Sequence, residues 1–232
     1  MKIKAKIATL SAAAILTLTF AGQSLAAANP FTDITNIAAK EAILELQEKG
    51  YIKGVGNNLF APDATMTAAQ GIQFIVNALE LNLDHVRFIK EPKATDYYAK
   101  ANNDAWYANA LIIASVNGLE LPADLDPGEE WTCEEFTHHL IQAAETHANL
   151  PKIKLVPVQI TDQDQLSIGY DGSIQRALTY GVAKLDGEGK FNPKGKISRA
   201  EAAEKVYNAL KYIKAHPYPA PKTGEAPVTE TK

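Results

Sequence analysis

Few residues in this chain have the types and spacing that chemistry needs. Glu135 and His138 lie three residues apart, with His139 beside them, which is the spacing of half of a di-metal motif on a helix. Such a site needs the motif twice, together with further carboxylates, and the sequence contains no second copy. A polar helix face therefore explains these residues better, and we expect no metal site and no cofactor.

Thiol and hydroxyl side chains offer no better candidates for catalysis. Cys133 is the only cysteine, so the chain forms no internal disulfide and has no resolving thiol. Thr67, Thr132 and Ser198 have no histidine or other base at a recognisable spacing. We therefore predict no catalytic residue and no enzyme activity. An enzyme, for example a hydrolase, is a rival interpretation, supported only by scattered acids and histidines.

The three hydroxyl residues belong instead to a repeated frame. Each follows a proline by five residues and precedes a Glu or Gln by three, and a glycine stands before each proline. The sets are Gly50, Pro62, Thr67 and Gln70; Gly118, Pro127, Thr132 and Glu135; and Gly181, Pro193, Ser198 and Glu201. The spacing of the last two members is that of a capping box at a helix N-terminus. The recurrence indicates that one supersecondary unit is used three times.

Apolar spacing predicts two helices in each copy of the frame. In the first copy, one helix runs from about Asn36 to Lys49 and ends before Gly50, where a left-handed glycine is typical. A loop rich in Gly, Asn and Pro follows, and a second helix begins behind Thr67 and runs to about Asn82. The sequence thus predicts an all-α fold of three tandem helix-loop-helix repeats. Their ranges are 29–90, 91–150 (divergent) and 151–214.

The two ends of the chain have distinct compositions. Residues 1–28 contain lysines, then an apolar run from Ile7 to Phe20, then small residues, which is typical of a secretory signal peptide. The run is shorter than the ~20 residues that a membrane span needs, so we expect an exported protein without a membrane span. Residues 215–232 hold four prolines and almost no aliphatic residues, and are expected to be a flexible tail.

The net charge argues against nucleic acid as a partner. The formal charge is −4, and it becomes about −7 without the three lysines of the signal peptide. An anionic polymer could therefore bind only through a local cationic pocket.

Several segments resemble the S-layer homology repeat. They are the start Phe31-Thr32-Asp33, the turn from Gly50 to Gly54, the loop from Gly189 to Pro193, and the helix start from Ile197 to Glu201. The resemblance covers residues from Phe31 to about Ile213. It implies a pseudo-threefold assembly whose grooves bind secondary cell-wall polysaccharide, often pyruvylated or otherwise anionic. It also implies a location at the cell wall or cell surface, with another envelope protein as a further candidate partner.

On this resemblance, Arg199 is the main candidate for ligand binding. A forked cation beside the N–H groups of a helix N-terminus suits a carboxylate ligand. Glu201 belongs to the same motif. Asp33 either contacts ligand at the groove mouth or starts the first helix. Trp106 either stacks on a sugar face or anchors its helix in the core.

The other copies depart from the family pattern. The arginine position is occupied by Ala68 in the first copy and by Cys133 in the second, and the usual tryptophan is replaced by Ala38 and Gly169. These departures support an alternative interpretation: a degenerate module that kept the fold and serves protein interaction or structure without glycan binding.

Overall fold

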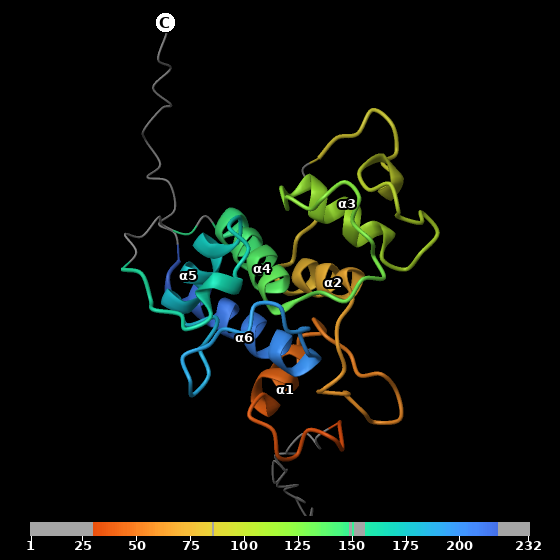
Figure 1. Cartoon of the computed structure of the whole chain (residues 1–232). Coiled ribbons are helices and arrows are strands. Elements are labelled where there is room, and N and C mark those ends of the chain that lie inside the picture. The colour runs from red at the N-terminus through yellow and green to blue at the C-terminus, as the bar shows by residue number, and fades with distance from the viewer. Residues whose placement is uncertain (1–29, 85, 149, 151–155, 218–232) are drawn as a thin grey trace, which may run out of the picture.

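The computed structural model describes residues 30–84, 86–148, 150 and 156–217 (Figure 1). Within these residues the chain forms six α-helices, two 3-10 turns and isolated β-bridges, but no β-strand. The all-α fold class is therefore confirmed. No described helix is long and apolar enough to cross a membrane. The expected signal peptide and residues 218–232 of the expected tail lie outside the described part of the chain.

Each copy of the frame contributes a short helix and then a capped helix. The short helices are α1 (Lys40–Glu48), α3 (Ala108–Val116) and α5 (Asp171–Thr179), and the capped helices are α2 (Ala68–Ala78), α4 (Cys133–His147) and α6 (Arg199–Ala215). The 3-10 turns are η1 (Ala94–Asp96) and η2 (Gln163–Gln165).

Two boundaries in the first copy differ from the expected ones. α1 begins at Lys40 rather than near Asn36, and no side chain caps it at Ala39. α2 ends at Ala78 rather than near Asn82, because Glu80 adopts a left-handed φ of 53°, which ends the helical conformation.

The three predicted capping boxes are confirmed. In α2, the backbone N–H of Gln70 donates to the Thr67 hydroxyl, and the Thr67 N–H donates to the Gln70 side chain at 3.0 Å. Thr132 with Glu135 and Ser198 with Glu201 form the same pair of bonds at the starts of α4 and α6. Each box satisfies donors that the helix itself leaves without partners.

The helices interlock between copies. The capped helices α2, α4 and α6 contact one another, and each also packs against the short helix of a different copy. α3 packs on α2, α5 on α4 and α1 on α6, as the ribbon shows (Figure 1). A single copy therefore does not complete its own core, as the repeat pattern predicts.

The residue before each cap joins a closed ring of backbone hydrogen bonds. Met66 N–H donates to Ile197 C=O at 3.1 Å, Trp131 N–H to Met66 C=O at 3.0 Å, and Ile197 N–H to Trp131 C=O at 3.0 Å. All three side chains are buried. The ring takes one residue from the same position of each copy, as a pseudo-threefold arrangement would.

Candidate functional site

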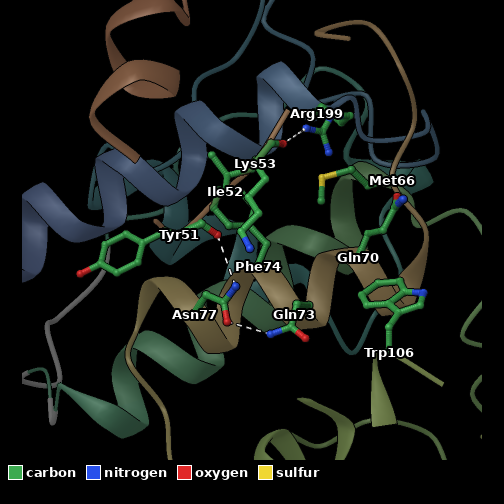
Figure 2. Close-up of a pocket in the computed structure, with 10 residues that line it drawn as sticks. All are labelled: Tyr51, Ile52, Lys53, Met66, Gln70, Gln73, Phe74, Asn77, Trp106 and Arg199. Atoms are coloured by element: carbon green, nitrogen blue, oxygen red, sulfur yellow. Dashed lines mark hydrogen bonds between the residues drawn. The ribbon is translucent and has the colours of Figure 1, made fainter. Parts of the chain in front are cut away.

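Three of the cavities in the described part of the chain lie near the starts of the capped helices. Groove 1 runs along α2, has a volume of about 510 Å³, and is lined by Tyr51, Ile52, Lys53, Met66, Gln70, Gln73, Phe74, Asn77, Trp106 and Arg199 (Figure 2). Groove 2 lies at the start of α4 with about 120 Å³, and groove 3 lies along α6 with about 190 Å³.

Grooves 1 and 3 are lined by corresponding positions. Tyr51, Ile52 and Lys53 follow Gly50 as Val182, Ala183 and Lys184 follow Gly181; Gln70, Gln73, Phe74 and Asn77 follow Thr67 as Glu201, Glu204, Lys205 and Asn208 follow Ser198. The repeat therefore produces the same groove twice with different side chains.

Arg199, the first residue of α6, lines groove 1 from a different copy than α2. Its Nε donates to the Phe60 carbonyl at 2.9 Å, and its Nη2 donates to the Lys53 carbonyl at 2.6 Å. The guanidinium carbon lies 4.5 Å from the centroid of the Phe60 ring. Within the described residues no carboxylate forms an ion pair with Arg199, and Nη1 has no hydrogen bond. The two carbonyls thus fix the position of the guanidinium, and its Nη1 group remains as a hydrogen-bond donor for a ligand.

Asp33 does not line groove 1 but supports the loop next to it. Its carboxylate accepts hydrogen bonds from the backbone N–H groups of Phe60 at 2.9 Å and Ala61 at 2.7 Å. It therefore holds the loop whose carbonyl holds Arg199. Burial alone would raise the pKa of Asp33, but these bonds and the Arg199 charge outweigh it and lower that pKa. Burial lowers the pKa of Arg199, and the Asp33 charge acts in the opposite direction.

Asp162 has the same role in the third copy. Its carboxylate accepts from the N–H groups of Phe191 at 2.8 Å and Asn192 at 2.9 Å. Our sequence analysis did not single out Asp162, although Ile160-Thr161-Asp162 repeats the pattern of Phe31-Thr32-Asp33.

Trp106 comes from the second copy and lies at the edge of groove 1 (Figure 2). Its side chain is 62% exposed, and its ring meets Tyr107 edge to face at 5.5 Å between centroids. An indole this exposed does not anchor a helix in the core. Its open face is instead available to a ligand in groove 1.

Glu201 lines groove 3 and completes the cap of α6. The structure thus brings Arg199 and Trp106 together, while Asp33 lies behind groove 1 and Glu201 lies in a different groove.

The N-terminus of α6 offers a ligand less than expected. The N–H groups of Arg199 and Ala200 donate to the carbonyls of Ala64 and Pro62, both at 2.9 Å, and that of Glu201 donates to the Ser198 hydroxyl. The expected use of these N–H groups for ligand binding is therefore wrong, because the first copy's loop already occupies them. Arg199 thus has only its guanidinium to offer groove 1.

Sequence reasoning missed the polar residues that complete groove 1. Lys53 is exposed and adds a second cation, while the Gln73 amide donates to Asn77 at 2.7 Å (Figure 2). A signal was present in the repeats. Lysine follows Gly50 and Gly181 by three residues, and asparagine follows Thr67 and Ser198 by ten.

Groove 3 has no arginine at the position that corresponds to Arg199, and a lysine supplies the positive charge. Cys133 stands at the position of Arg199 and is buried, which raises the pKa of its thiol and leaves it unreactive. Lys205, from the second turn of α6, instead places its ammonium 5.2 Å from the centroid of the Phe191 ring. A cation therefore lies over the corresponding aromatic ring in both grooves.

No three His, Cys, Asp or Glu side chains of the described residues gather where they could hold a metal ion. His138 instead bonds through Nδ1 to the Ser173 hydroxyl at 2.9 Å. Its ring stacks on Tyr170 at 4.4 Å between centroids.

Comparison with known proteins finds a family model that matches two of the three copies. The model of the S-layer homology domain matches residues 30–70 and 159–203, in the first and third copies. The Surface-layer 125 kDa protein of Lysinibacillus sphaericus is 26% identical over 216 residues, which are 90% of this chain and 17% of that protein. Exoglucanase XynX of Acetivibrio thermocellus is 26% identical over 183 residues, 78% of this chain and 16% of that protein. The chain thus spans less than a fifth of the length of either of these two relatives.

Proposed function

Because the chain carries S-layer homology domains in its first and third copies, we propose that it is an exported cell-envelope module that binds a secondary cell-wall polysaccharide non-covalently. The similarity to a surface-layer protein supports a place at the cell surface. Groove 1 is the binding site, and the polymer is a pyruvylated or otherwise anionic glycan. The observation that carries the proposal is the guanidinium of Arg199, fixed in groove 1 with no carboxylate of the described residues paired to it.

The composition of groove 1 suits a charged sugar. Arg199 and Lys53 supply two positive charges, and charge-assisted bonds from arginine to a carboxylate are stronger than neutral ones. Trp106 supplies an exposed ring face against which the apolar face of a sugar ring can pack. Gln73 and Asn77 supply amides for hydroxyl groups. The proposed role is binding, without catalysis.

Retention on purified, protein-free cell-wall sacculi tests the proposal. The intact protein should be retained, and Arg199→Ala should weaken retention about 10- to 100-fold, from the worth of a hydrogen bond to a charged group. Trp106→Ala should weaken it about threefold to tenfold. Chemical removal of carboxylate substituents from the sacculi should have the same effect as Arg199→Ala.

Matched variants separate binding from folding. Arg199 also holds two loop carbonyls, so Lys53→Ala, at an exposed side chain, provides a second test that does not disturb the fold. Lys184→Ala is its counterpart in groove 3 and should leave retention unchanged. No retention of the intact protein would contradict the proposal and favour a protein-interaction role, which Ala68 and Cys133 at the arginine positions already suggest. Release of soluble sugar or peptide would indicate an enzyme.

A further inference from the structure

Groove 2 has the opposite charge to groove 1. Its lining includes the carboxylates of Asp124, Asp126, Glu129 and Glu135 and a single ammonium group, that of Lys100. Ala68 stands at the position of Arg199 and is fully buried. A pocket with this lining repels an anionic polymer and attracts a cation.

A buried histidine in groove 2 has an unused nitrogen. The His139 side chain lines the groove and is 2% exposed, and its Nδ1 has no hydrogen-bond partner. Burial lowers the pKa of His139 to about 3, so the ring is neutral near pH 7 and one of its nitrogens accepts hydrogen bonds. A buried polar atom left without a partner costs about 1–3 kcal/mol. His139 lines the same groove as the acids, so a ligand that donates a hydrogen bond would satisfy this nitrogen.

Aromatic rings form other walls of the same groove. Trp131 stacks on His139 at 5.1 Å between centroids, and Tyr170, partly exposed, lies 6.3 Å from His139. Aromatic faces attract cations, and they also pack against the C–H face of a sugar ring. Groove 2 therefore combines negative charge, an acceptor and aromatic surface.

The arrangement suits an organic cation better than a metal ion or a lysine side chain. Within the described residues no three possible metal ligands gather at one point, so the carboxylates surround the cavity without forming a coordination site. A lysine side chain has no hydroxyl group, whereas the carboxylates of this lining can accept hydrogen bonds from hydroxyl groups as well as from an amine. A hydroxylated ligand satisfies more of these groups.

We propose that groove 2 is a second binding site, specific for the protonated amine of an unacylated amino sugar. The amine lies among the carboxylates and donates to His139, while the sugar ring packs on Tyr170. This site does not depend on the anionic polymer in groove 1, since the two grooves share no lining residue.

Titration followed by NMR tests the site. The probes are a tetrasaccharide of glucosamine and its fully N-acetylated counterpart, at a mildly acidic pH that protonates the amine. The glucosamine form should shift the Trp131 indole and His139 ring signals saturably, and the acetylated form should not. Asp124→Asn and Glu129→Gln should each weaken binding about fivefold, and His139→Phe about tenfold.

Controls distinguish this proposal from the function of groove 1. Glu204→Gln alters a carboxylate of groove 3, and Lys53→Ala alters groove 1; both should leave amine binding unchanged. Equal shifts with the acetylated probe would overturn the proposal. Unchanged affinity in Asp124→Asn would also overturn it, because that side chain is exposed and bonds to none of the described residues. Binding of lysine amide without binding of the tetrasaccharide would overturn the choice of an amino sugar.

Discussion

Grooves 1 and 2 are built on the same frame and differ in nearly every side chain that a ligand would meet. Phe74 in groove 1 corresponds to His139 in groove 2, and the arginine that enters groove 1 is replaced by Ala68. The capping boxes and the backbone ring are nevertheless the same in both copies. The difference teaches that the caps and the ring maintain a common frame, while the sign of each groove's charge is set by the side chains placed on it, some of which, such as Arg199 and Glu135, also hold the fold.

Substitution of Phe60, the aromatic residue beneath Arg199, should have the largest effect on this comparison. Phe60 is fully buried, and its ring supports Arg199 and lies 5.5 Å from the Phe31 ring. Phe60→Ala should lower the free energy of unfolding by about 3–5 kcal/mol and weaken retention on sacculi. Urea denaturation and the sacculus assay measure the two effects.

Leu125, two residues before Pro127 as Phe60 is before Pro62, is the matched control. Leu125→Ala should also lower the free energy of unfolding, by about 2–5 kcal/mol, and folded Leu125→Ala protein should keep its retention. Equal loss of retention by both folded variants would show that the grooves are not independent.

The pH dependence of stability should differ between the two corresponding positions, His139 and Phe74. The folded-state pKa of His139 is about 3, well below its usual value, so the unfolded chain binds more protons between these pH values. The contribution of neutral His139 to the free energy of unfolding is therefore fully present above about pH 6.5. As the pH falls toward 3, this contribution should decrease by about 1 kcal/mol per pH unit.

His139→Phe makes the second copy resemble the first and should flatten this part of the pH profile. Thermal or urea unfolding from pH 7 to 4 measures it, with Phe74→Leu as a control at the corresponding position. The same slope in wild type and His139→Phe would mean that the acid sensitivity originates elsewhere.

The third groove extends the comparison with a smaller effect. Cys133→Arg introduces the missing arginine, but Lys205 already lies over Phe191, so the single variant should lose about 1–3 kcal/mol by overpacking and charge repulsion. The double variant Cys133→Arg with Lys205→Phe reproduces the layout of groove 1 and should recover most of that stability. If the double variant is no more stable than Cys133→Arg alone, the grooves are not interchangeable.

The helices were predictable from the sequence because their signals are local. The caps at Thr67, Thr132 and Ser198 and the apolar spacing behind them predicted the order and type of all six helices. The helix ends near Asn36 and Asn82 were less accurate, since they depend on the backbone conformation of single residues such as Glu80.

The site was predictable only in part. Arg199 and Trp106 were singled out through a family resemblance, and the structure places both in groove 1. Asp33 and Glu201 serve the loop and the cap, roles that depend on which backbone N–H groups lie nearby. The acidic lining of groove 2 was not foreseen, because Asp124 and His139 meet only when the loop of the second copy folds over α4.

The ring of bonds among Met66, Trp131 and Ile197 also limits how this architecture can vary. An open solenoid lengthens by adding a unit at either end, because each unit contacts only its neighbours. Here every member of the ring already has both a donor and an acceptor partner, so a further copy could not join this ring without breaking one of its bonds. The backbone at this position is therefore constrained, whereas the side chains that line the three grooves are free to differ.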